Sequence, residues 1–333
     1  MRFVVYGAGA VGGVVGGRLA QHGHDVVLIA RGAHAEAMRR NGLRIDSAAG
    51  SVTLTPPVHE HPSEITWRGD EVVVLGVKGQ DTDAALTALS GCVPAAAPIV
   101  CLQNGVANER RALRRFANVY GVCVMCPAGH LEPGVVVAYA HPVAALLDIG
   151  RYPRGSDGLC GRIAEAINVS GMESVVRDDI MRWKHTKLLM NLGNAIGAVI
   201  GPQARGGRLY DMARAEGVEC RRAAGIDFAS MDEDRARRAD KLRFGPVTGQ
   251  KRFGDSSWQS LARGTGAIET DYLNGEIVLL GRVYGVPTPV NALLQDLANE
   301  AARDRRAPGA LTEEEVLGRL DAATGIRPTE PTP

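Results

Sequence analysis

A lysine and two asparagines in the second half of the chain have the spacing of one helix face. Lys187, Asn191 and Asn194 occur at positions i, i+4 and i+7, among apolar residues. Ammonium and amide groups are costly to bury there unless a partner satisfies them. A bound polar ligand would do so, whereas the alternative is a solvated lysine beside two core asparagines. Lys184 lies one turn earlier in a more polar segment, so Lys187 is the better candidate for contacting a ligand.

A second polar group consists of Ser257-Trp258-Gln259 and Glu269. We expect a helix over Ala267–Tyr284 that places Glu269 on an apolar stripe, where a carboxylate needs a partner. That partner could be a substrate hydroxyl, Lys187 or another polar group. The alternative is an ion pair or a half-exposed position, since acidic residues are favoured in the first turn of a helix.

Four polar features in the first half of the chain follow predicted strands. They are the glycine-rich turn Gly7–Gly12, Arg31, Lys78 and Asn104. Ligands of open parallel sheets bind outside the carboxyl ends of the strands, so these features should share one edge. Lys78 could neutralise a cofactor phosphate or meet an anionic substrate, and an exposed loop lysine is the alternative. Asn104 precedes a glycine, so a purely conformational role in a turn is also open.

The glycine-rich turn has the pattern of a dinucleotide-binding site. Gly7-Ala8-Gly9-Ala10-Val11-Gly12 joins the predicted strand Arg2–Tyr6 to a helix that ends near His22, and a second strand follows at Asp25–Ala30. The first glycine permits the tight turn, the second allows the backbone to approach a pyrophosphate, and the third allows close helix–strand packing. The helix N-terminus offers free N–H groups to the anion. The alternative is a glycine-rich turn without a ligand.

Arg31 refines the cofactor prediction. NAD-type sites usually carry Asp or Glu at the end of the second strand, where it accepts hydrogen bonds from the ribose. Here Ala30-Arg31-Gly32 contains no carboxylate. A guanidinium can grip a 2′-phosphate with paired, charge-assisted hydrogen bonds, so NADP(H) is favoured over NAD(H). A solvated surface arginine is the alternative.

Composition excludes several other classes of protein. The 333 residues carry a net charge of +1, which gives no general attraction to nucleic acid or anionic membranes. No apolar run is long enough to span a bilayer, and the chain enters a strand directly, so we expect a cytoplasmic protein. Cys123 and Cys126 form a C-x-x-C pair, but no second pair has metal-ligand spacing. We therefore expect six reduced cysteines and no metal.

Strand and helix patterns alternate up to about residue 175 and then give way to helices. Glu71–Val77 is typical of a central parallel strand buried on both faces. Val135–Tyr139 and Ala144–Ile149 are expected to form a hairpin that finishes the sheet, and Glu173–Arg177 to be a last strand. A long helix should then run from Ile180 to about Ile200.

These patterns predict an α/β Rossmann-type N-terminal domain followed by an all-α C-terminal domain. The NADP-binding domain should cover residues 1–175 and the helical substrate and catalytic domain residues 176–302. Residues 303–333 form a tail that should be partly disordered, with one short helix at Glu313–Leu320 and disorder over the last ten residues. Apolar faces in the helical domain could form a homodimer, and an intramolecular core accounts for them equally well.

Several motifs, in this order, resemble the ketopantoate reductase (2-dehydropantoate 2-reductase) family. They are GAGAVG at the start, Arg31, VKGQDT, LQNG, KLLMN and ETDYLNG, and the resemblance runs from Met1 to about Ala302. It implies NADPH-dependent reduction of 2-dehydropantoate to (R)-pantoate, on the route to pantothenate and coenzyme A. It also implies a Rossmann domain and a helical domain with the active site in the cleft between them.

The resemblance also assigns roles to the candidate residues in the first half and on the first long helix. Lys187 would be the general acid that protonates the developing alkoxide, and Asn104 would hold the substrate and the nicotinamide region. Lys78 would lie beside cofactor and substrate, and Asn191 and Asn194 would line the substrate pocket. A fixed ammonium and an amide donor suit this reaction, because hydride transfer leaves negative charge on the former carbonyl oxygen.

The remaining implied roles belong to the substrate side. Ser257 would contact the substrate carboxylate, and Glu269 a substrate hydroxyl. The family's N-x-x-x-N after the lysine is N-x-x-N here, and its S-M-x-Q-D segment is Ser257-Trp258-Gln259-Ser260-Leu261. These departures leave open a reductase of another bulky 2-keto acid. A non-catalytic NADP(H)-binding sensor is the alternative from a different functional class.

Overall fold

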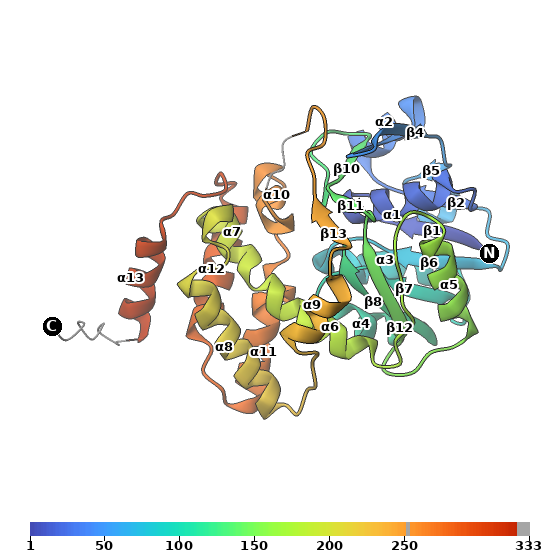
Figure 1. Ribbon diagram of the computed structural model, residues 1–333. Helices are drawn as coiled ribbons and strands as arrows, with labels where there is room; N and C mark the ends of the chain where they lie inside the picture. Colours follow the sequence, from blue (N-terminus) through green and yellow to red (C-terminus); the bar gives the residue numbers. More distant parts are fainter. Residues whose placement is uncertain (251–253, 325–333) are drawn as a thin grey trace. The chain divides into compact units, whose positions relative to one another are not determined.

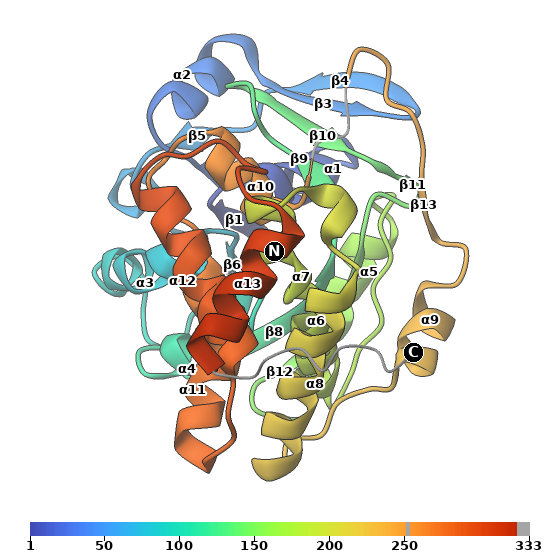
Figure 2. The ribbon, with the colours of Figure 1, turned by 90° about the vertical axis from the view of Figure 1, so that its left-hand side faces the viewer.

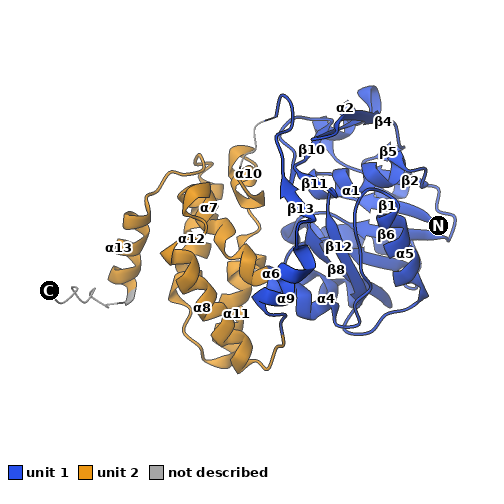
Figure 3. Cartoon of the chain, viewed as in Figure 1, with its two compact units in different colours: residues 1–187, 228–252 blue, residues 188–227, 253–333 orange. Residues whose placement is uncertain are grey.

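The computed structural model describes residues 1–250 and 254–324, and the chain divides into two compact units (Figure 3). Unit 1 comprises residues 1–187 and 228–252, and unit 2 comprises residues 188–227 and 253–333. The division falls inside helix α6 (Ile180–Asn191), whereas the sequence placed it near residue 175. The last nine residues of the expected disordered tail lie outside the described residues.

Unit 1 is built on a seven-stranded sheet with the order β12-β8-β7-β6-β1-β2-β5 (Figure 1). All neighbouring strands are parallel except β12, which runs antiparallel to β8 at the edge. The sheet confirms the predicted Rossmann-type region. Its strands are β1 (Arg2–Tyr6), β2 (Val26–Ile29), β5 (Val58–His59), β6 (Glu71–Leu75), β7 (Pro98–Cys101), β8 (Asn118–Met125) and β12 (Leu146–Arg151).

Helices cover both faces of this sheet, which is why its central strands are apolar throughout. One face packs against α1 and α5, and the other against α3 and α4. Glycines allow α1 to approach β1 closely: a Cβ atom at Gly16 would stand 3.1 Å from the side chain of Val5. The bounds are α1 (Ala10–Gln21), α2 (Gly32–Asn41), α3 (Thr82–Ser90), α4 (Asn108–Leu113) and α5 (Gly158–Asn168). Short 3-10 turns lie at Pro62–Glu64 and Gly79–Asp81.

The predicted hairpin at the end of the sheet is wrong. β10 (Val135–Ala138) belongs to a second sheet with β3 (Leu43–Ser47), β4 (Gly50–Leu54) and β9 (Ala128–Gly129). It packs on α1, where a Cβ atom at Gly13 would stand 2.7 Å from Val136. Both apolar runs therefore find buried faces, but on different sheets. The predicted strand Glu173–Arg177 makes only isolated bridges to β12, at Glu173 and Val176.

Residues 228–252 also belong to unit 1, whereas the sequence assigned them to the helical domain. This segment contains α9 (Met231–Arg238) and β13 (Leu242–Phe244), and β13 pairs with β11 (Ala140–Pro142). Arg237 anchors it: its side chain is 9% exposed, and its guanidinium lies 2.6 Å from the Asp148 carboxylate and 2.8 Å from that of Glu173. Such desolvated, charge-assisted contacts are short and directional, so they fix the segment on unit 1.

Unit 2 is a group of helices (Figure 2), and a network of polar side chains joins several of them. Glu216 accepts hydrogen bonds from the backbone and side chain of Asn291, and Asn291 accepts one from Asn274. Burial raises the pKa of the Glu216 carboxyl group, while these donors act to lower it. The helices are α7 (Gly193–Val199), α8 (Arg208–Ala223), α10 (Ser256–Ala262), α11 (Asn274–Tyr284), α12 (Pro289–Arg303) and α13 (Glu313–Thr324), with 3-10 turns at Pro202–Ala204 and Thr270–Tyr272.

Two predicted helices differ from the observed ones. The helix expected from Ile180 to Ile200 is interrupted at Leu192, whose carbonyl oxygen accepts a hydrogen bond from the buried Asn274 side chain at 3.2 Å. The helix expected over Ala267–Tyr284 starts only at Asn274, so Glu269 lies before a short 3-10 turn. A side chain from a distant segment thus contacts the first break, and a 3-10 turn occupies the start of the second expected helix.

Within the described residues, we find no helix that combines the length and the apolar character needed to cross a bilayer. Nor do three or more His, Cys, Asp or Glu side chains gather there as metal ligands would. The six cysteines are free, and four of them are buried.

Candidate active site

The carboxyl ends of four adjacent parallel strands in unit 1 carry the candidate residues of the first half of the chain. The glycine-rich turn follows β1, Lys78 follows β6, Asn104 follows β7, and Arg31 follows β2. Since β1, β2, β6 and β7 are parallel, these positions lie along one edge of the sheet. Lys78 and Asn104 are half-buried, and Arg31 is exposed.

The glycine-rich turn has the geometry of an anion cradle. Gly7 adopts φ +103°, and a Cβ atom there would stand 2.5 Å from Val77 N, so only glycine fits. A Cβ atom at Gly12 would stand 2.2 Å from Gly7 O. At Gly9, by contrast, no described atom other than those of its chain neighbours lies within 4 Å of the Cβ position, and no side chain caps the N-terminus of α1. The backbone is therefore accessible beside free N–H groups, which fits a dinucleotide pyrophosphate.

His34 supports this turn, although no sequence pattern predicted a role for it. Its Nε2 lies 2.8 Å from Ala8 O, and its Nδ1 accepts a hydrogen bond of 2.8 Å from the Gly134 N–H group. Together these contacts select the neutral ring with the proton on Nε2. Burial also lowers the pKa of His34. Nothing near residue 34 in the sequence signals this role, because both partners come from distant segments.

Arg31 is the most exposed of the candidate residues. Its side chain is 73% exposed, and its Nη2 atom lies 3.6 Å from Asp81 Oδ1, a distance typical of a loose surface ion pair. The guanidinium can therefore turn to an incoming phosphate without giving up a strong contact.

A hydrogen-bond network joins the loops after β6 and β7. Gln103 donates to Val77 O and to Thr82 Oγ1, both at 2.8 Å, and Thr82 donates to Asn108 Oδ1 at 2.9 Å. Asn108 Nδ2 in turn donates to Asn104 O at 3.1 Å. The network fixes the loops that carry Lys78 and Asn104. The LQNG and VKGQDT motifs contain four of these five residues, but the sequence does not show that they meet.

The buried lysine of α6 holds that helix against the same strand ends. Lys184 is 2% exposed; its Nζ donates to Gln103 O at 2.7 Å and Val122 O at 3.0 Å, and lies 2.9 Å from the fully buried Glu109 carboxylate. Glu109 accepts no hydrogen bond that meets normal geometry from a described residue, so the ion pair is its compensation. The two residues lie far apart in sequence, and no local pattern pairs them.

Lys187 lies one turn beyond Lys184 and is half-buried. Its ammonium acts electrostatically on the thiols of Cys123 and Cys126, at the carboxyl end of β8. Burial nevertheless raises the pKa of Cys123 to about 11 and that of Cys126 to about 12. Lys187 thus acts on thiols of β8 and of the residue that follows it, and β8 is the neighbour of β7 in the sheet.

The other candidate residues lie in unit 2, and all are buried. Asn191 is 2% exposed, Asn194 3%, Ser257 2% and Glu269 6%. α7 carries Asn194 and α10 carries Ser257, and these two helices pack against each other. The Ser257 hydroxyl has no hydrogen-bond partner among the described residues. A buried hydroxyl without a partner is costly, which is typical of a group that a ligand satisfies.

Comparisons with known proteins agree with the fold. The family description "Ketopantoate reductase PanE/ApbA" matches residues 3–152, and its C-terminal counterpart matches residues 179–302. The 2-dehydropantoate 2-reductase of Halobacterium salinarum is 31% identical over 317 residues, covering 91% of this chain and 100% of the relative. That of Pyrococcus horikoshii is 28% identical over 304 residues, covering 88% and 95%.

Solved structures show the same architecture. A PanE/ApbA family ketopantoate reductase from Ralstonia eutropha has a TM-score of 0.76 and 27% identity, and the match covers 92% of this chain and 100% of that one. A D-mandelate dehydrogenase in complex with NADH and anilino(oxo)acetate has a TM-score of 0.77 with the same coverage, but 22% identity, and so shows likeness of fold alone. With two family models that together span most of its length, the chain is an oxidoreductase of the ketopantoate reductase family.

Proposed function

We propose that this oxidoreductase reduces a 2-keto acid with NADPH, and that 2-dehydropantoate, giving (R)-pantoate, is the first substrate to test. The observation that carries the proposal is the anchoring of α6, the helix that carries Lys187. One turn before Lys187, Lys184 Nζ donates to Gln103 O, in the loop after β7 that also carries Asn104, and to Val122 O of β8. Curated relatives named 2-dehydropantoate 2-reductase support the choice of substrate.

Each residue has a defined task in this proposal. Bound at the glycine-rich turn, the nicotinamide cofactor supplies the hydride that reaches C2 of the substrate. Lys187 then protonates the oxygen on which negative charge develops, and the Asn104 amide donates a hydrogen bond to the substrate. Donors fixed in advance stabilise this charge more in the transition state than in the ground state. Asn191, Asn194, Ser257 and Glu269 hold the substrate, and Lys78 neutralises its carboxylate or a cofactor phosphate.

The choice between NADPH and NADH rests on Arg31. Its exposed guanidinium follows β2, where an NAD-type site would have a carboxylate. We expect Arg31→Gln to raise the KM for NADPH while leaving that for NADH nearly unchanged. Equal effects on both cofactors, or faster turnover with NADH in the unchanged enzyme, would contradict the assignment.

Oxidation of NADPH in the presence of 2-dehydropantoate tests the substrate. A panel of bulky 2-keto acids, including aromatic ones, should be compared by kcat/KM, because Trp258 replaces the methionine of the usual family segment and a structural neighbour binds anilino(oxo)acetate. Highest kcat/KM for another keto acid would replace 2-dehydropantoate as substrate. No turnover of any keto acid, with NADPH binding intact, would refute the proposal. Lys187→Ala separates an enzyme from a sensor, since only the enzyme loses its cellular function.

A further inference from the structure

An arginine outside the family motifs contacts one candidate substrate residue in unit 2 and is linked through an aspartate to another. Arg205 Nη2 donates a hydrogen bond of 2.7 Å to Asn194 Oδ1, and its Nε lies 3.5 Å from the Asp255 carboxylate. Asp255 accepts hydrogen bonds from the N–H groups of Ser257 and Trp258 at the start of α10. The arginine is thus linked through Asp255 to the helix end that carries Ser257.

The backbone of α7 is shaped to admit these two side chains. A Cβ atom at Gly193 would stand 2.7 Å from Arg205 O and 2.9 Å from its Cγ. A Cβ atom at Gly197, one turn along, would stand 2.5 Å from Asp255 Oδ2. The two glycines therefore let Arg205 and Asp255 lie against the helix beside Asn194. Asp255 is 8% exposed, whereas the Arg205 side chain keeps 40% of its surface exposed.

The contacts of Arg205 leave one end of its guanidinium available. Nε and Nη2 face Asp255 and Asn194, and no described residue accepts a hydrogen bond from Nη1. Nη1 and the second hydrogen of Nη2 form a planar fork that matches the two oxygens of a carboxylate. The fork is held in place before a ligand arrives, which reduces the entropy lost on binding. The Ser257 side chain is 2% exposed, and its hydroxyl has no hydrogen-bond partner among the described residues, which is a second indication of a ligand site in this part of unit 2.

We propose that Arg205 binds the carboxylate of the keto-acid substrate in a bidentate manner and makes the enzyme select acids over the corresponding esters and amides. This inference rests on the proposed function, which supplies the keto acid. Asn194 and Asp255 act as positioning residues that orient the guanidinium. The ionic contact favours a carboxylate because a neutral ester accepts no paired, charge-assisted hydrogen bonds.

The test compares a 2-keto acid with its methyl ester in the unchanged protein and in Arg205→Gln. We expect kcat/KM for the acid to fall about 10- to 100-fold, mainly through KM, as loss of charge-assisted hydrogen bonds does. The ester should lose much less, so the acid-to-ester ratio collapses. Arg205→Lys should fall between the two, because it keeps the charge but not the fork. Equal losses for acid and ester, or no loss for the acid, would overturn the inference.

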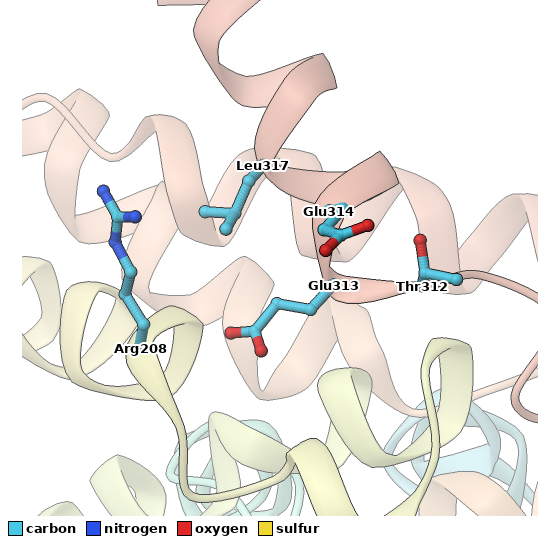
Figure 4. A pocket seen from close by; sticks show the side chains of 5 residues that line it. All are labelled: Arg208, Thr312, Glu313, Glu314 and Leu317. Atoms are coloured by element: carbon cyan, nitrogen blue, oxygen red, sulfur yellow. The ribbon is translucent and has the colours of Figure 1, made fainter. Parts of the chain in front are cut away.

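Arg208 provides a matched control. It lies three residues further along and lines a separate hollow of about 460 Å³ with Thr312, Glu313, Glu314 and Leu317 (Figure 4). Arg208→Gln removes the same charge and should leave the acid-to-ester ratio unchanged. If Arg205→Gln is poorly folded because Asp255 loses its partner, the double variant Arg205→Gln/Asp255→Asn removes both charges together. A ratio that is unchanged in this folded double variant would also overturn the inference.

Calorimetry of keto-acid binding to the enzyme–NADP⁺ complex separates this inference from the proposed function. Turnover without any dependence of acid binding on Arg205 would refute the role of Arg205 and leave the reductase intact. Acid binding that depends on Arg205 without turnover would support the site and refute the reductase. A failure of the unchanged protein to bind any keto acid would refute the Arg205 site directly.

Discussion

Replacing Lys184 by methionine should destabilise unit 1 severely. The change keeps the length of the side chain but removes the ammonium that lies 2.9 Å from Glu109. The side chains of Lys184 and Glu109 are 2% and 0% exposed, so the variant leaves a buried carboxylate without its counter-charge. Breaking a buried ion pair in this way costs about 3–5 kcal/mol. The carbonyl groups of Gln103 and Val122 lose their donor as well.

A double-mutant cycle tests this reasoning. Lys184→Met/Glu109→Gln removes both charges, so it should be more stable than Lys184→Met alone by at least about 1 kcal/mol. Urea unfolding followed by tryptophan fluorescence is a suitable assay. In a Trp258→Phe background the remaining tryptophans, Trp67 and Trp183, both belong to unit 1.

An exposed ion pair of the same unit serves as the control. Arg40 and Glu36 lie 2.9 Å apart on α2, with side chains 66% and 71% exposed. Arg40→Met should cost no more than about 0.5 kcal/mol. If Lys184→Met costs as little as Arg40→Met, or if the double variant is no more stable than Lys184→Met, the buried pair does not hold α6 as the structure implies.

Four further predictions follow from the strand-edge site. Gly9→Ala should weaken NADPH binding, measured by fluorescence titration, without lowering the melting temperature. Gly12→Ala should lower the melting temperature, since only Gly12 lacks room for a Cβ atom. Equal effects of the two variants on the melting temperature would contradict the open glycine turn. Lys187→Ala should lower kcat about 10²- to 10⁴-fold, as loss of a general acid does, with NADPH binding retained; a smaller kinetic loss would remove Lys187 from the chemistry. Burial lowers the pKa of His34 below its unfolded value of about 6.5, so its contribution to stability is present above that pH and lost as pH falls through the folded pKa. From about pH 7 to about pH 5, the unfolding free energy of the unchanged protein should therefore fall more steeply than that of His34→Gln. Parallel curves would contradict this. Because burial raises the pKa of Cys126 to about 12, its thiol stays protonated near neutral pH, and mass spectrometry should find it alkylated by iodoacetamide far more slowly than in urea.

Local sequence patterns were sufficient for the parts of the molecule that depend on chain neighbours. Residues 71–75 of the apolar run at 71–77 form a central, fully buried strand, and the G-x-G-x-x-G pattern forms a turn whose Gly7 requires a positive φ. Residues after successive parallel strands must share an edge, so strand order alone placed Lys78 and Asn104 together. The preference for Lys187 over Lys184 as the residue that contacts a ligand remains a prediction. The buried ion pair of Lys184 with Glu109 is consistent with it.

Only tertiary structure decided the features that depend on residues distant in sequence. Hydrophobicity marked Val135–Ala138 as a strand, but packing on the glycines of α1 chose its sheet. At the break, Leu192 O accepts a hydrogen bond from Asn274, and residues 228–252 contact unit 1 through the ion pair between Arg237 and Asp148. Arg205 lies in no recognised motif, and only its contacts with Asn194 and Asp255 in the folded chain make it a candidate for binding the substrate. A pattern of residue types states which groups need a partner, whereas the partner is selected by burial and geometry, which exist only once the chain has folded.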